Sequence, residues 1–275
     1  MTLVEAGVLG VVQGVTEFLP ISSIAHLRVV PALLGWADPG AAYSAVIQLG
    51  TLLAVLVYFA GDMRHMARGV LEGIRSGQPL GNQEARLAWY IAVGTLPIVV
   101  CGLAFKRTIV GEARSLYVIA ASLVGLGILM WVAERTAGFR REVKDIRWRE
   151  SQVIGLAQAV ALIPGSSRSG TTITAALFMG LTREAAARFS FLLGIPAIGA
   201  AGVFELVELI QHGLSEAGLL ALVVGNVTSA VSGYLAIDLL LRYLRRNTTF
   251  VFVWYRLALG LLLLAGLWAG VLQPM

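Results

Sequence analysis

Six long runs of apolar residues, separated by short polar or charged segments, make up most of the chain. Each run is close in length to the ~20 residues that an α-helix needs to cross the hydrocarbon core of a bilayer. This pattern predicts an all-α membrane protein with six transmembrane helices. The six predicted helices cover residues 43–60, 87–105, 116–133, 189–209, 217–241 and 250–272.

Two further apolar stretches, 3–36 and 153–180, are each interrupted near the middle by proline, serine and ionisable residues. The interruptions fall at 16–23 and 163–170, and the apolar segments on either side are too short to span a bilayer. A broken helix is tolerated at membrane depth only where protein or a water-filled cavity surrounds the break. We therefore expect two re-entrant helix–break–helix hairpins inside the bundle.

The charge distribution predicts the orientation of this bundle. Only 13% of the residues are charged and 57% are hydrophobic, whereas soluble domains carry roughly 25% charged residues. The loops after the first, third and fifth predicted helices hold most of the Lys and Arg, which places them in the cytoplasm. Both termini then face outward, and the first hairpin enters from outside and the second from the cytoplasm. The sequence has no basic stripe with interleaved aromatic residues, so we expect no nucleic-acid partner.

The two interruptions share a motif. Pro20 and Pro164 each begin a Pro-x-Ser-Ser sequence, and the two motifs are 144 residues apart. A Gly-x-x-Gln sequence precedes each of them, starting at Gly10 and at Gly155. This shared spacing indicates an internal repeat.

Each repeat would contain one hairpin and three spans, repeat one covering about 1–134 and repeat two about 150–275. An odd number of spans forces the second repeat to have inverted topology within one membrane domain, residues 1–275. Folds of this kind place their binding sites near the midplane, at the broken elements. We expect the two interruptions to face each other in the core of the bundle.

The first interruption carries candidate catalytic groups. Glu17 and His26 are ionisable residues at membrane depth, which are costly there and indicate function. Ser22 and Ser23 follow a proline, and one of them is expected to cap the next helix. Ser23 and His26 are spaced i, i+3, so a helix makes them neighbours and allows a nucleophile–base pair. The alternative is a structural ion pair between Glu17 and Arg168 with a hydrogen-bonded histidine.

The second interruption is rich in hydrogen-bond donors and small residues, which suits an anion site better than a plain loop. A helix that starts near Ser167 would direct its free N–H groups and dipole at an anion, and Arg168 would add a guanidinium that matches phosphate oxygens. The predicted phosphate-binding residues are Ser22, Ser167, Arg168, Ser169, Gly170 and Thr172.

Gln13 and Glu17 are spaced i, i+4 and therefore lie on one helix face. One amide oxygen and one carboxylate can hold Mg²⁺ or Ca²⁺, with substrate phosphate completing the coordination shell. A lone amide also often pairs across helices, so Gln13 by itself is weak support for a metal.

In the segments 13–26 and 164–170 the chain resembles the bacterial undecaprenyl-diphosphate phosphatases of the BacA/UppP type, and the resemblance extends over essentially the whole length. The first family motif is Glu or Gln, three residues, then Glu, which Gln13 and Glu17 match. The family's Ser and His fall on Ser23 and His26.

The family's Ser-Arg pair falls on Ser167 and Arg168. Ile24 and Ala25 stand where many members have Thr-Gly, and Gln13 replaces the commoner Glu, which removes one negative charge from the metal site.

The resemblance implies hydrolysis of undecaprenyl diphosphate to undecaprenyl phosphate and inorganic phosphate in the plasma (inner) membrane. This reaction recycles the lipid carrier of peptidoglycan synthesis and confers resistance to bacitracin. The resemblance also implies a metal-assisted reaction and a site that opens to the periplasmic face. The expected partners are a polyprenyl diphosphate and membrane lipids.

Several alternatives remain open from the sequence. The nucleophile is Ser23, His26 or water, and Glu17 or His26 takes the proton. Inverted repeats with broken helices also suit a carrier or flippase for an anionic polyprenyl phosphate. A Ser–His protease is a further alternative, but peptide amides have no charge for Arg168 to neutralise. A small-residue patch at 194–202 allows close helix packing and a homodimer.

Overall fold

The computed structural model describes residues 1–213 and 215–273, and within these ranges the chain is helical without a β-strand. A bridge pair between Arg141 and Leu181 joins two connecting segments. The α-helices are α1 (Leu3–Phe18), α2 (Ser23–Leu34), α3 (Gly40–Val46), α4 (Gln48–Tyr58), α5 (Ala60–Arg75), α6 (Gln83–Ala104), α7 (Lys106–Val110), α8 (Leu116–Thr136), α9 (Trp148–Val160), α10 (Arg168–Phe178), α11 (Arg183–Gln211), α12 (Glu216–Leu244) and α13 (Phe250–Trp268).

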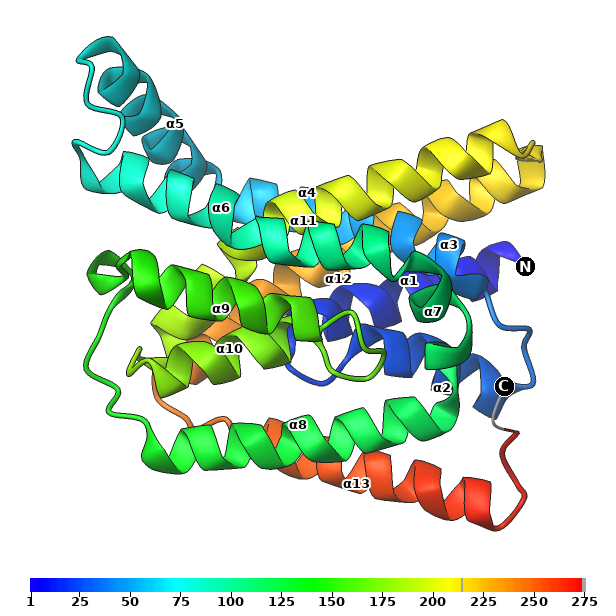
Figure 1. Cartoon of the computed structure of the whole chain (residues 1–275). Helices are drawn as coiled ribbons and strands as arrows, with labels where there is room; N and C mark the ends of the chain where they lie inside the picture. Colours follow the sequence, from blue (N-terminus) through cyan, green and yellow to red (C-terminus); the bar gives the residue numbers. More distant parts are fainter. Residues whose placement is uncertain (214, 274–275) are drawn as a thin grey trace.

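Six helices of the described chain are long and apolar enough to cross a membrane, which confirms the six predicted spans. The first span is made by α3 and α4 together, with a turn at Ile47, and the others are α6, α8, α11, α12 and α13. Helices α11 and α12 each have 29 residues, so they are longer than predicted. The start of α1 and the end of α13 lie at the same end of the bundle (Figure 1), as six spans require.

The two interrupted stretches fold as the predicted helix–break–helix units. Helices α1 and α2 have 16 and 12 residues, and α9 and α10 have 13 and 11, so each is shorter than a membrane span. Figure 1 shows both units between the long helices, with α8 and α13 running along one side.

Each break ends in a serine that caps the following helix. Ser22 (φ 75°) accepts a hydrogen bond from the Ala25 N–H, and Ser167 (φ 69°) accepts one from the Gly170 N–H. A positive φ at a residue other than glycine costs about 1–3 kcal/mol and persists only where the surrounding structure enforces it. The prediction that one serine of the first pair caps a helix is confirmed for Ser22.

The two Gly-x-x-Gln sequences mark close helix crossings between the halves of the chain. Helix α1 packs on α12, and α9 packs on α6. A Cβ atom at Gly10 would lie 3.0 Å from the carbonyl carbon of Gly225, and one at Gly155 would lie 2.8 Å from Cα of Gly94. Each hairpin therefore packs against a long helix of the other half, at a point where only glycine lets the backbones approach.

Substituting Gly155 by alanine should lower the stability of the protein in detergent by about 1–3 kcal/mol, the usual cost of overpacking. The comparison is the thermal unfolding midpoint of Gly155→Ala against that of Gly125→Ala. Gly125 lies in α8, and a Cβ atom there meets open space. Equal midpoints for the two variants would contradict the packing role of Gly155.

Candidate active site

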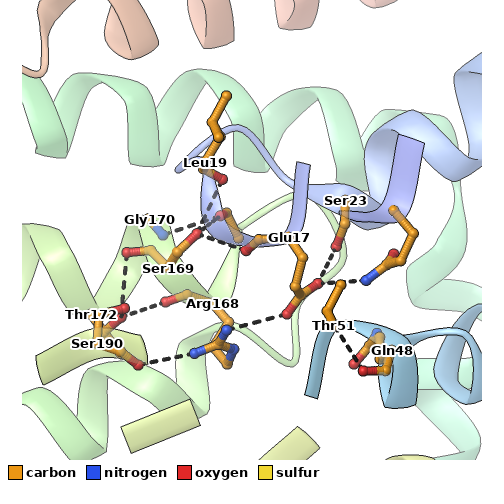
Figure 2. Close-up of polar contacts among 12 residues, drawn as sticks. Glu17, Leu19, Ser23, Gln48, Thr51, Arg168, Ser169, Gly170, Thr172 and Ser190 are labelled. Atoms are coloured by element: carbon orange, nitrogen blue, oxygen red, sulfur yellow. Dashed lines mark hydrogen bonds and ion pairs between the residues drawn. The ribbon is translucent and has the colours of Figure 1, made fainter. Parts of the chain in front are cut away.

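The carboxylate of Glu17, near the end of α1, lies at the centre of a buried polar cluster (Figure 2). Its Oε2 atom accepts hydrogen bonds from Ser23 Oγ at 2.8 Å and from Gln13 Nε2 at 2.9 Å. Its Oε1 atom accepts one from Arg168 Nη2 at 3.3 Å. Ser23 is the first residue of α2 and Arg168 is the first residue of α10, so one carboxylate joins the starts of two helices from opposite halves of the chain.

Two residues of α11 fix the guanidinium of Arg168. Its Nη1 atom donates to the carbonyl oxygen of Ser190 at 3.1 Å. A Cβ atom at Gly194 would overlap the guanidinium, so the absence of a side chain there makes room for it. The Nε atom of Arg168 is buried and has no hydrogen-bond partner among the described residues.

Hydrogen bonds assign the tautomer of His26. Its Nδ1 atom lies 2.7 Å from the carbonyl oxygen of Ser22, and a carbonyl only accepts, so Nδ1 carries a proton. Its Nε2 atom lies 2.6 Å from the hydroxyl of Tyr255 in α13, and the two rings are stacked with centroids 5.6 Å apart. In neutral His26 the free lone pair is therefore on Nε2 and accepts from Tyr255.

This geometry changes the pairing that the sequence allowed. Ser23 and His26 do lie on one helix, but the hydroxyl of Ser23 donates to Glu17 and both ring nitrogens of His26 bond elsewhere. Since Ser23 opens α2, its side chain reaches back across the break to α1. The group placed to take a proton from Ser23 is Glu17.

Contacts of the second break show that the two breaks meet, as predicted. The Ser169 hydroxyl lies 3.2 Å from the carbonyl oxygen of Glu17 and 3.1 Å from that of Leu19 (Figure 2). The Thr172 hydroxyl lies 2.7 Å from the Arg168 carbonyl oxygen and 2.6 Å from Ser190 Oγ. These contacts favour a positioning role for Ser169 and Thr172 over the direct phosphate contact expected from sequence.

Three of the predicted phosphate-binding residues take part in capping the helix N-termini: Ser22, Ser167 and Gly170. The hydroxyl of Ser167 accepts from the N–H of Gly170 at 3.1 Å, and the hydroxyl of Ser22 accepts from that of Ala25 at 3.3 Å. The first N–H groups of α10 have no acceptor within the helix and carry the positive end of its dipole. An anion next to Arg168 would therefore be stabilised by the helix as well as by the side chain.

Sequence reasoning missed Tyr255 and Arg256, which α13 contributes to the same region. Arg256 is fully buried, and its guanidinium donates to main-chain carbonyl groups of both breaks. The signal was present, because Arg256 lies inside a long apolar run and an ionisable residue at membrane depth indicates function.

The residues at Glu17 fit a divalent cation that also has ligands from elsewhere. The Oε1 atom of Gln13 is buried without a hydrogen-bond partner, while its amide nitrogen donates to Glu17. No group of three or more His, Cys, Asp and Glu side chains that could hold a metal ion occurs in the described part of the chain. Gln13 and Glu17 thus offer two oxygen ligands, and Mg²⁺ is commonly held by one or two carboxylates together with substrate phosphates.

The fold and the cluster define a multi-pass α-helical membrane protein with a buried polar site built from two broken hairpins. The chain belongs to the family described as bacitracin resistance protein BacA, whose family model matches residues 6–262. The resemblance seen in the sequence motifs is thereby confirmed.

Curated relatives match over the full length of the chain. An undecaprenyl-diphosphatase of Myxococcus xanthus is 54% identical over 275 residues, which cover 100% of this chain and 92% of the relative. Undecaprenyl-diphosphatases of Chlorobaculum tepidum and Chlorobium phaeovibrioides are 51% and 53% identical, with 100% of each chain covered.

Proposed function

We propose that this chain is an integral-membrane phosphatase that hydrolyses undecaprenyl diphosphate to undecaprenyl phosphate and inorganic phosphate. The observation that carries the proposal is the Glu17 carboxylate, which joins a serine hydroxyl and a buried arginine at the starts of two helices. The names of its relatives support the substrate. In the cell the reaction would recycle the lipid carrier of peptidoglycan synthesis and confer bacitracin resistance.

Binding of the diphosphate is assigned to Arg168 and to the start of α10. We assign the buried Nε of Arg168, which has no partner among the described residues, to a phosphate oxygen, while its Nη atoms hold the side chain against Ser190 and Glu17. Phosphoryl transfer depends mainly on positioning and on charge stabilisation, and a fixed arginine with a helix N-terminus supplies both.

The chemical step is assigned to Ser23. Its Oγ atom attacks the terminal phosphorus while its proton passes to Glu17, and the bond from phosphorus to the bridging oxygen breaks to release undecaprenyl phosphate. Water then attacks the phosphorus, the bond from phosphorus to Ser23 Oγ breaks, inorganic phosphate leaves, and Glu17 returns its proton to Ser23 Oγ. His26 holds the start of α2 through the Ser22 carbonyl and is bonded to Tyr255, which favours Glu17 over His26 as the base.

A divalent cation would be held by Glu17 and Gln13. When bound, Mg²⁺ or Ca²⁺ supplies positive charge that offsets the charge of the phosphate oxygens. Phosphate release from undecaprenyl diphosphate by the purified protein in detergent should fall by about 10²-fold or more on adding EDTA, because removing one donor to a developing oxyanion already costs about that much. Adding Mg²⁺ or Ca²⁺ back should restore the rate.

Two outcomes of this assay would overturn parts of the proposal. Full turnover in excess EDTA would exclude the cation. No release by well-folded wild-type protein, with or without the cations, would reject the phosphatase, and transport of the lipid across vesicles would then test the carrier. A Glu17→Gln variant in the same assay is expected to be inactive under all conditions.

The position of Arg168 can be tested without changing it. The Gly194→Ala variant adds a methyl group where the guanidinium lies, and a misplacement of about 1 Å can cost about 10²-fold in rate. We expect kcat/KM to fall by that factor. In the control, Gly199→Ala on the same helix, the added Cβ would lie 3.5 Å from Leu52, which is ordinary contact. Wild-type kinetics in Gly194→Ala would contradict the proposal that the position of the Arg168 guanidinium matters for catalysis.

The membrane setting follows from the six apolar helices, and its details are part of the proposal. We place the protein in the plasma membrane with the arginine-rich segments after α4, α8 and α12 in the cytoplasm, and we propose that the site opens to the periplasmic side. The two hairpins would be re-entrant, and residues 1–134 and 150–275 would be inverted repeats.

The homodimer finds no support in the small-residue patch at 194–202. Added Cβ atoms at Gly194 and Gly202 would meet Arg168 and Leu49 of the same chain, so these two glycines pack inside the protein.

A further inference from the structure

Arg256, in the second turn of α13, is the largest fully buried side chain of the described residues. A buried charge is costly unless it is paired or fully hydrogen-bonded. None of the ion pairs among the described residues includes Arg256. Its positive charge is therefore held by neutral groups.

These groups are main-chain carbonyls from three separate segments. Nη1 donates to Pro20 in the first break at 3.1 Å. Nη2 donates to Gly165 and Ser166 in the second break at 3.2 and 3.0 Å. Contacts of 3.3 and 3.4 Å reach the carbonyls of residues 122 and 123 in α8. One side chain thus connects both breaks to a long helix.

The guanidinium contacts the segments that lead into the proposed site. Pro20 precedes the capping residue Ser22, and Gly165 and Ser166 precede the capping residue Ser167. A Cβ atom at Gly170 would lie 2.9 Å from Nη1 of Arg256, so the cation touches the first turn of α10. Ser22 and Ser167, which both have a positive φ, therefore each follow a segment whose carbonyl groups accept hydrogen bonds from Arg256.

The charge of Arg256 differs from that of Arg168 in one respect. Glu17 offsets the charge of Arg168 at 3.3 Å, whereas Arg256 has no carboxylate partner among the described residues. Electrostatic interactions are stronger in a buried site than in water. The diphosphate of the proposed substrate would bring negative charge next to a cation that the protein leaves uncompensated.

We propose that Arg256 is a positioning residue for the phosphatase reaction, which fixes the two breaks relative to each other and supplies the uncompensated positive charge that attracts the diphosphate. The inference rests on the proposed function. It goes beyond it because Arg256 touches no reacting atom: it acts through the backbone that precedes Ser23 and Arg168, and through its charge.

The test compares Arg256→Lys and Arg256→Gln with wild type, using kcat and KM for undecaprenyl diphosphate per folded molecule. Lysine keeps the charge but cannot donate to carbonyl groups of all three segments at once. We therefore expect kcat to fall about 10²-fold while KM changes little. Glutamine removes the charge as well. Binding of undecaprenyl diphosphate should then weaken at least tenfold more than binding of undecaprenyl phosphate. The control is Arg242→Gln, whose side chain is exposed and pairs with Asp238.

A purely structural Arg256 would lower only the folded fraction. Wild-type kcat and KM per folded molecule in both variants would overturn the proposal. If neither variant folds, Gly170→Ala is the second test, because its methyl group would press on Nη1 of Arg256 at 2.9 Å, with the capping residue Ser167 next nearest at 3.1 Å, and kcat should fall at least tenfold. An unchanged rate in that variant would also overturn the proposal. Wild-type protein that binds but does not hydrolyse the lipid would instead reject the proposed function, and the binding comparison would still test Arg256.

Discussion

Replacing Ser23 by alanine is expected to reduce phosphate release from undecaprenyl diphosphate by about 10³-fold or more, as removal of a catalytic nucleophile does elsewhere. The hydroxyl of Ser23 donates to Glu17 at 2.8 Å, so it has a base in contact and lies at the positive end of α2. Among the described residues, no other hydroxyl group donates to the carboxylate of Glu17; the Ser169 hydroxyl bonds to its main-chain carbonyl. The measurement is the steady-state rate in detergent with saturating Mg²⁺ or Ca²⁺.

The control for Ser23→Ala is Ser229→Ala. Ser229 is fully buried in α12 and donates to the carbonyl oxygen of Ile47 at 3.0 Å, away from Glu17. Both variants lose one buried hydroxyl group, so only the position differs. Turnover of Ser23→Ala within tenfold of wild type would exclude Ser23 as nucleophile and favour direct attack by water. Phosphate bound to Ser23 after acid quenching of wild type would give independent support.

Replacing Arg168 by alanine should be equally severe, with kcat/KM lowered about 10³-fold or more. The variant loses the proposed phosphate donor and leaves Glu17 as a buried charge without its partner. Removing one partner of a buried ion pair costs about 3–5 kcal/mol of stability. Rates must therefore be normalised to the folded fraction, measured by thermal unfolding. Arg168→Lys should recover stability better than activity, since lysine cannot contact both Ser190 and Glu17 with a planar fork.

The control for Arg168 is Arg188→Ala. Arg188, on the neighbouring helix α11, pairs with Asp62 at 2.8 Å, and both side chains are about one-third exposed. Exposed pairs contribute about 0–1 kcal/mol, so this variant should keep wild-type kinetics and nearly wild-type stability. A normal kcat/KM in Arg168→Ala would remove the proposed phosphate site.

The apolar pattern was sufficient to predict the six spans and the two broken hairpins, because membrane thickness sets helix length and a short apolar segment cannot cross. Polar residues at depth identified Glu17, Ser23 and Arg168, which the fold brings together. What a linear sequence could not give was the direction of each side chain. The i, i+3 rule holds within a helix, but Ser23 is the first residue of α2 and bonds back across the break to α1.

The alignment of the two proposed repeats also could not be read from the sequence motifs alone. The Pro-x-Ser-Ser motifs are 144 residues apart and align Ser23 with Ser167. The structure instead gives the same left-handed capping role to Ser22 and Ser167, which are 145 residues apart, as are Gly10 and Gly155. In that register Ser23 corresponds to Arg168. The first position after the cap thus carries the proposed nucleophile in one half and the guanidinium in the other.

The contacts made by α13 are the least predictable part of the site. Tyr255 and His26 are separated by 229 residues, and Arg256 and Pro20 by 236. No local spacing rule relates such positions, so only the tertiary packing of α13 beside both breaks reveals them. An isolated arginine in an apolar helix indicates that a partner exists without identifying it.

The exchange of partners between the two halves has a consequence for biogenesis. Helix α1 leaves the ribosome before α12, yet Gly10 of α1 packs against Gly225 of α12, which follows it by 215 residues. The Pro20 carbonyl of the first break gains its hydrogen bond later still, because Arg256 lies in α13. During synthesis the first hairpin therefore has to remain at the membrane with unfilled contacts. If Arg256 has the proposed role, a chain that stops before α13 would be inserted in the membrane without hydrolysing the lipid.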